Sequence, residues 1–122
     1  HSQRVIFLPH VVPLDRGIYS TSFLETTEKL EQGDVLAIYR DFYKGETFVR
    51  IIEDPSLIDL QGVRDTNLCD ISFFTDPDSN KVMIFSATDN MIKGASGQAV
   101  QNMNVMFGLE EDEGLQQLAL YP

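Results

Sequence analysis

The chain has 122 residues, 43% hydrophobic and 23% charged, and 19 acidic against nine basic side chains give a net charge of −10. This length suits one domain, and no run of about 18 apolar residues offers a membrane span. The negative charge excludes a generic binder of nucleic-acid phosphates. One cysteine excludes an internal disulfide framework and a multi-cysteine zinc site. We therefore expect an acidic, cytoplasmic, globular chain that binds neither nucleic acid nor membrane.

The chain begins with His1 and Ser2 rather than Met, and no cationic segment followed by a long apolar run stands near its start. A secretory signal needs both of those features, so none is expected. We expect instead that His1 and Ser2 mark an engineered or internal start, and that the chain is a portion of a longer protein.

Apolar runs and chain-breaking residues alternate through the first half of the sequence. Residues 5–8 form an apolar run closed by a proline, which predicts a buried strand, and two prolines make 9–17 an extended, non-helical segment. Apolar and polar residues alternate over 18–27, which predicts a second strand. Apolar residues three and four apart predict an amphipathic helix over 34–43, and 48–52 is predicted to be a short strand.

A hairpin is the clearest feature of the second half. Residues 67–75 and 81–88 are both apolar and β-prone, and the turn-forming residues 76–80 between them predict an antiparallel pair of strands. The predicted order is strand, strand, helix, three strands, helix, without the strict alternation of a doubly wound sheet. It predicts the α+β class, with a mixed, largely antiparallel sheet and helices on one face.

The last element is predicted to be a helix over 91–107, with Asp89 or Asn90 as its N-cap and a glycine after it. We expect two parts in the chain: residues 1–88 form the sheet domain, and residues 89–122 form a C-terminal helix and tail.

The composition of this last helix is unusual, because no charged residue lies between Lys93 and Glu110. One side carries an apolar stripe at helical spacing, which a core would explain: Ile92, Ala95, Ala99, Met103, Met106 and Phe107. The other side carries primary amides rather than the charges of a solvated face: Gln98, Gln101, Asn102 and Asn104. Two interpretations stay open, a tightly packed buried helix and a surface that hydrogen-bonds a polar partner.

Three segments of the chain resemble one known family. Residues 89–109 read DNMIKGASGQAVQNMNVMFGL, with EGL at 113–115, and this long stretch resembles the C-terminal signature of N-acetyl-gamma-glutamyl-phosphate reductases. Residues 7–18, FLPHVVPLDRGI, followed by Thr21, are similar to a strand-and-loop motif of that family. Residues 67–71, NLCDI, are similar to its strand before the hairpin.

The resemblance implies an NADPH-dependent reductase of arginine biosynthesis, in which a cysteine thiolate attacks an acyl phosphate and hydride reduces the resulting thioester. The implied fold is a glyceraldehyde-3-phosphate dehydrogenase-like C-terminal domain. No glycine-rich dinucleotide fingerprint and no second cysteine are present, so the chain resembles only the C-terminal third of such an enzyme. The implied partners are the missing N-terminal Rossmann domain, on which residues 89–122 would pack, and a second copy of the chain. The implied cofactor is NADP, held by the whole enzyme and not tightly by this fragment.

Two alternatives remain open beside this interpretation. One is a stand-alone, non-catalytic binding or oligomerisation module. The other is part of an enzyme like aspartate-semialdehyde dehydrogenase, which shares a similar Asp-Asn-x-x-Lys-Gly start to its last helix. The continuation over 97–104 favours the arginine-pathway family.

No catalytic residue is expected in this chain. Cys69 lies on an apolar strand beside an acidic residue that would raise its pKa, so we expect a structural cysteine and place the nucleophile and the catalytic histidine outside the chain. No spacing of potential ligands suggests a metal site.

Substrate contacts are expected from His10, which could instead be structural, and from Arg16, which could instead form a surface salt bridge. Cofactor contacts are expected from four residues at the start of the last helix: Asn90, Lys93, Gly94 and Gln98. Without a cofactor domain to cover it, that helix is expected to self-associate, swap or remain partly mobile.

Overall fold

The structure is a computed structural model that describes residues 5–119; His1 and Ser2 lie outside the described residues. The elements follow one another as β1 (Ile18–Glu25), α1 (Gln32–Phe42), β2 (Val49–Ile51), η1 (Pro55–Leu57), β3 (Cys69–Thr75), β4 (Lys81–Thr88), η2 (Ile92–Ser96) and α2 (Gly97–Phe107). None of the helices in this part of the chain is both long and apolar enough to cross a membrane.

The strands form one sheet in the order β1-β4-β3-β2. β4 pairs antiparallel with both β1 and β3, whereas β2 pairs parallel with β3. The predicted hairpin is confirmed, although its first strand begins at Cys69 rather than at residue 67. The predicted α+β class and the mixed, largely antiparallel sheet are also confirmed.

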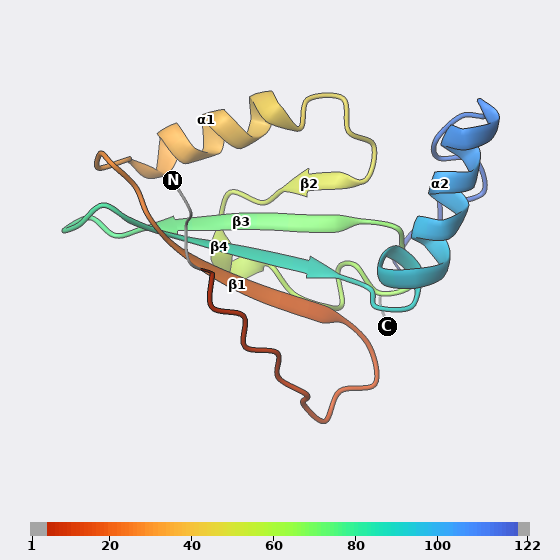
Figure 1. Cartoon of the computed structure of the whole chain (residues 1–122), viewed down its shortest axis with the longest axis horizontal. Coiled ribbons are helices and arrows are strands. Elements are labelled where there is room, and N and C mark those ends of the chain that lie inside the picture. Colours follow the sequence, from red (N-terminus) through yellow and green to blue (C-terminus); the bar gives the residue numbers. More distant parts are fainter. Residues whose placement is uncertain (1–4, 120–122) are drawn as a thin grey trace.

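Helix α1 covers one face of this sheet (Figure 1). Its Val35 packs with Ile71, Phe73 and Val82 of the sheet, and the rings of Tyr39 and Phe73 lie 4.3 Å apart. The helix begins two residues before its predicted start, because the backbone N–H of Glu31 donates to the Asp34 carboxylate in a capping box. The apolar spacing of this helix therefore corresponds to a buried face, as the sequence predicts.

The opposite face of the sheet is only partly covered. Ile58 and Val63 of the segment that joins β2 to β3 form a small buried cluster with Ala87 of β4. Beyond it, Phe23 lies beside Met83, which in turn lies beside Phe74, in one row across three strands. The Phe23 side chain is 76% exposed, so this row forms an apolar surface, which we call the outer row.

The predicted strand over residues 5–8 is wrong. The chain there is irregular, and the four apolar side chains are 73–84% exposed. An apolar run signals burial, but a strand also needs hydrogen bonds from a neighbouring strand. No described strand pairs with this run. The expectation that 9–17 is non-helical is confirmed, although the segment bends near Pro13 and Arg16.

Helix α2 lies beyond the end of the sheet where β4 finishes, and α1 alone lies along the sheet face (Figure 1). The predicted final helix is confirmed in extent, but it opens with the π-helical turn η2 before α2 begins. It ends at Gly108, whose φ of 69° is the left-handed conformation that glycine adopts readily.

The C-terminal end of the apolar stripe of α2 does not face a core within the described residues. Met106 and Phe107 are 80% and 75% exposed, whereas the amide residue Asn104 is 2% exposed. The Asn104 side chain donates to the backbone oxygens of Glu111 and Glu113 in the acidic segment that follows the helix. Asn104 and Gln101 of the amide side therefore pack inward, whereas Asn102, Met106 and Phe107 are exposed.

Candidate functional site

Asp89 lies at the end of β4 and connects three segments of the chain. Its Oδ1 accepts hydrogen bonds from the backbone N–H groups of Met91 and Ile92, at 2.7 and 2.9 Å, and so caps η2. Its Oδ2 accepts from the backbone N–H of Asp65 at 2.8 Å and from Arg16 Nη2 at 2.5 Å. The N-cap position of η2 is Met91, so neither predicted residue occupies it, but the Asp89 side chain accepts from the first N–H groups of this turn and Asn90 does not.

The charge state of Asp89 follows from these contacts. Burial by itself would raise the pKa of this carboxyl group, but the hydrogen bonds from three backbone N–H groups and from Arg16 outweigh burial and lower the pKa. The hydrogen bond to Asp89 likewise raises the pKa of Arg16, whose Nη2 also contacts Asp65 Oδ1 at 2.8 Å. Asp89 is therefore a buried carboxylate with a charged partner.

A second connection lies one residue further along the chain. The backbone N–H of Gly17 donates to Asn90 Oδ1 at 2.7 Å. Gly17 has a φ of 105°, and a side chain there would strike Leu60 at 2.7 Å, so this close approach needs glycine. Residues 9–17, which carry both predicted substrate-binding residues, are thus joined at Arg16 and Gly17 to the start of η2.

Lys93 points toward the interior of the chain. Its Nζ lies 5.3 Å from the centre of the Phe48 ring and donates to Gln101 Oε1 at 2.7 Å. Partial burial lowers the pKa of Lys93, which nearby Cys69 and Glu111 partly offset. The Lys93 ammonium is therefore held by the chain's own groups.

Cys69 lies next to Lys93 and is half-buried. Burial raises the pKa of the Cys69 thiol and Asp70 adds to the rise, while Lys93 acts in the opposite direction. A thiol with a raised pKa is a poor nucleophile, because only the thiolate attacks. This environment agrees with the prediction that Cys69 is structural.

The inward side of α2 forms a polar network. Gln101 Oε1 accepts from Asn67 Nδ2 at 3.0 Å as well as from Lys93, and its amide nitrogen donates to the Glu111 carboxylate. A side chain at Gly97 would strike Asn67 Oδ1 at 2.4 Å. The small residue is therefore required by a contact within the chain, and the amide side of the helix has polar partners here.

The remaining predicted residues are more exposed. The Nδ1 atom of the His10 ring is hydrogen-bonded to the backbone oxygen of Leu8 at 3.0 Å. Gln98 donates to Asn102 at 3.1 Å on the outer part of α2. Gly94 is exposed, and a side chain there would approach Ile18 at 3.4 Å.

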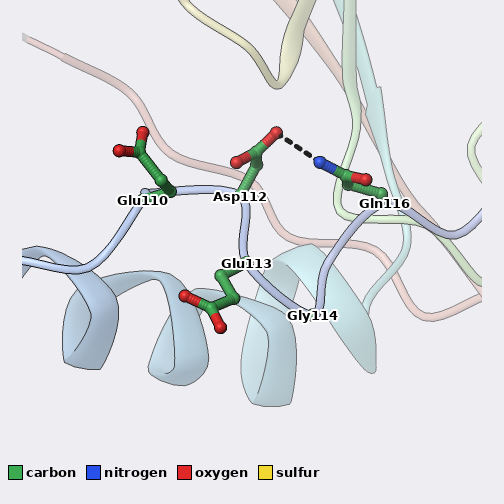
Figure 2. A pocket seen from close by; sticks show the side chains of 5 residues that line it. All are labelled: Glu110, Asp112, Glu113, Gly114 and Gln116. Atoms are coloured by element: carbon green, nitrogen blue, oxygen red, sulfur yellow. Dashed lines mark hydrogen bonds between the residues drawn. The ribbon is translucent and has the colours of Figure 1, made fainter.

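A shallow acidic hollow lies in the loop after α2, lined by Glu110, Asp112, Glu113, Gly114 and Gln116. Figure 2 shows Gln116 donating to Asp112 while Glu113 points to the other side of the loop. Across residues 5–119, no three potential ligand side chains converge in a way that could hold a metal ion.

Comparison with known proteins places this sequence in a family. Residues 1–90 match the family model described as semialdehyde dehydrogenase, dimerisation domain. The chain belongs to this family. The match ends at Asn90.

Full-length relatives extend the comparison. A protein of Geotalea daltonii named N-acetyl-gamma-glutamyl-phosphate reductase is 46% identical over 118 residues, which cover 97% of this chain and 34% of the relative. Proteins of the same name from Methanosarcina acetivorans and Methanocella arvoryzae are 50% and 47% identical and cover 93% and 100% of the chain. The chain spans about a third of the length of these curated relatives.

Sequence reasoning missed two residues of this dimerisation-domain site. Asp65 lies between η1 and β3 and has a φ of 60°, a conformation rare for a residue other than glycine. Asn67 was assigned to a strand, whereas its amide reaches α2. A polar residue beside an apolar strand was the available signal for Asn67, and nothing in the sequence distinguished Asp65 from other surface carboxylates.

Proposed function

We propose that this chain is the C-terminal part of an NADP-dependent N-acetyl-gamma-glutamyl-phosphate reductase, which forms N-acetyl-glutamate 5-semialdehyde. The observation that carries the proposal is the 46–50% identity to the three relatives of that name over almost the whole chain. None of these three is named for aspartate semialdehyde, so that alternative is not favoured, and neither is a stand-alone module.

In the proposed enzyme, the attacking cysteine and the catalytic histidine lie in the remaining two thirds of the protein. The substrate's acyl carbon is attacked by the thiolate and phosphate leaves. When bound, NADPH supplies the hydride for reduction. This chain contributes a substrate-side segment, residues 9–17 with His10 and Arg16, and a cofactor-side turn at the start of the last helix.

The cofactor-side residues we propose are Asn90, Lys93, Gly94 and Gln98. The Asn90 amide oxygen is used by Gly17, and within residues 5–119 its amide nitrogen has no protein acceptor, which leaves it free to donate to a carboxamide. Gly94, Ala95 and Ser96 are small and exposed, so the outer side of η2 can approach a flat ring closely. These features fit a nicotinamide edge, while Lys93, held by Gln101, supports the turn from inside.

We propose a second copy of the chain as the partner of the outer row. The matching family model is a dimerisation domain, and the outer row exposes Phe23 on the face of the sheet that α1 does not cover. In the full-length protein, Phe23→Lys is expected to convert a dimer to a monomer in sedimentation velocity. Phe42→Lys, on an equally exposed aromatic of α1, is the control and should leave the dimer intact. A dimer that survives Phe23→Lys contradicts this surface.

We propose that the N-terminal Rossmann domain of the parent protein covers the apolar stripe of α2, so that residues 1–88 and 89–122 act as separate parts. The outward direction of Met106 and Phe107 and the threefold greater length of the relatives support this proposal. A cytoplasmic location, expected from the single thiol, belongs to the same proposal.

Two measurements test the proposed function. The full-length protein that carries this chain should oxidise NADPH only when N-acetyl-glutamyl phosphate is present, and this chain alone should show no activity. Titration calorimetry of this chain with NADPH should show no heat of binding. Micromolar affinity of the isolated chain, or a full-length protein without reductase activity, would overturn the proposal.

A further inference from the structure

A buried carboxylate connects two segments proposed for different roles, beside the hydrogen bond from Gly17 to Asn90. Residues 9–17 lie on the substrate side of the proposed site, and η2 lies on its cofactor side. Asp89 contacts both, since its Oδ1 caps η2 and its Oδ2 accepts from Arg16. The pairing of β1 with β4 ends at Ile18 and Thr88, directly before these contacts. Beyond that pair, Arg16 and Gly17 are joined to Asp89 and Asn90 by polar contacts, and the described hydrophobic clusters include no residue of either segment.

The two carboxylate oxygens of Asp89 have different hydrogen-bond partners, so their contributions can be separated by substitution. Among residues 5–119, Oδ1 accepts only from the backbone N–H groups of Met91 and Ile92, and Oδ2 accepts only from the backbone N–H of Asp65 and from Arg16. Asp89 is fully buried, so water cannot replace a lost partner cheaply. A change at Oδ2 alone would therefore remove the attachment of Arg16 and Asp65 while keeping the hydrogen bonds to Met91 and Ile92.

Arg16 is bound to both carboxylates through the same nitrogen, Nη2. Its Nε is buried and, within residues 5–119, has no hydrogen-bond partner. The guanidinium is thus fixed by Asp65 and Asp89 rather than aimed as a whole at solvent. This geometry favours a role of Arg16 in holding the segment, and of the two predicted substrate-binding residues only His10 is exposed.

We propose that Asp89, with Arg16, is a positioning residue of the reductase reaction: the pair fixes the substrate-side segment 9–17 against the cofactor-side turn η2. This inference rests on the proposed function. Hydride transfer needs the reacting carbon and the hydride donor within a narrow range of distance and angle, and a displacement of about 1 Å can reduce the rate about a hundredfold. Asp89 touches neither reactant and acts through the two segments.

The test uses Asp89→Asn in the full-length protein. The asparagine side chain keeps an oxygen that accepts from the backbone N–H groups of Met91 and Ile92. Its amide N–H₂ then faces Arg16 Nη2 and the backbone N–H of Asp65, which are both donors. We expect kcat per folded protomer to fall about tenfold or more, with the KM for NADPH changed less than about threefold, because η2 keeps its cap. Arg16→Gln should give a similar loss, and the double variant should be no worse than either single variant.

Asp76→Asn is the matched control. Asp76 also caps a backbone N–H, that of Asp78, but in the hairpin turn at the other end of the sheet. Its loss should lower stability and leave kcat per folded protomer unchanged. A purely structural role of Asp89 would make the two variants behave alike.

Hydrogen exchange separates failure of this inference from failure of the proposed function. In Asp89→Asn, or in Arg16→Gln should the first variant not fold, the Gly17 and Asp65 amides should exchange at least about tenfold faster, while amides inside α2 keep their protection. An inactive parent protein would overturn the reductase proposal, and with it the positioning role. An active parent whose kcat changes less than twofold in both variants, or unchanged Gly17 exchange, would overturn the inference alone.

Discussion

The two main helices of this chain use amphipathic sequences in opposite ways. α1 turns its apolar side toward the sheet, where Val35 is buried against Phe73. α2 turns its amide side toward the chain, where Asn104 and Gln101 find partners, and leaves Met106 and Phe107 exposed. The difference shows that a stripe pattern identifies a helix and its two sides, but the side that packs within the chain depends on which partners the chain contains.

The largest change in stability is expected when one of two phenylalanines, one buried and one exposed, is replaced by alanine. Phe73→Ala should lower the free energy of unfolding by about 3–5 kcal/mol, because the buried ring leaves a cavity under α1. Phe107→Ala should change it by less than about 0.5 kcal/mol in this chain, because that ring is exposed. Urea unfolding measures both values, and equal losses would contradict the contrast.

A second test concerns the carboxylate that joins β4 to η2. Asp89→Asn should lower the free energy of unfolding by about 1.5–3 kcal/mol at pH 7, through lost hydrogen bonds to a charged group. The pKa of Asp89 is lower in the folded chain than in the unfolded chain. Its stabilisation is therefore present above the unfolded pKa of about 3.9 and is lost as the pH falls through the folded value.

Urea unfolding as a function of pH measures this dependence. The difference in stability between the chain and Asp89→Asn should shrink below about pH 4. Asp15→Asn, which removes an exposed carboxylate near Arg64, should leave the acid dependence unchanged. A constant difference between the chain and Asp89→Asn across pH 2–7 would mean that the carboxylate charge contributes nothing.

A smaller loss of stability is expected from a substitution on the amide side of α2. Asn104→Ala should lower the free energy of unfolding by about 1–2 kcal/mol, because two backbone oxygens of the following loop lose their donor. Asn102→Ala, on the exposed part of the helix, should have almost no effect. Thermal unfolding of the two variants compares them, and the opposite order would mean that the amide side does not pack inward.

Sequence reasoning succeeded where the partner of an element lies nearby in the chain. The hairpin formed by β3 and β4 has its turn between its strands, and α1 packs on the strands that follow it, so alternation and helical spacing were sufficient. It failed for residues 5–8, whose apolar character revealed a need for burial but no partner strand.

The candidate site was predictable in part. The resemblance of residues 89–109 predicts cofactor contacts at the start of the last helix, which stay a prediction, and Asp89 was one of two expected caps. The connection of Asp89 to Arg16 joins residues 73 positions apart, and local spacing cannot report such a contact. Asp65 could not be found, because its role depends on a backbone N–H that points at Asp89.

The central claim is that the apolar stripe of α2 belongs to a contact outside this chain. Oxidative footprinting of Met103 and Met106, which are both exposed here, tests it directly. The account predicts rapid oxidation of both methionines in this chain and at least about tenfold slower oxidation in the full-length protein. Equal rates in the two proteins would contradict it.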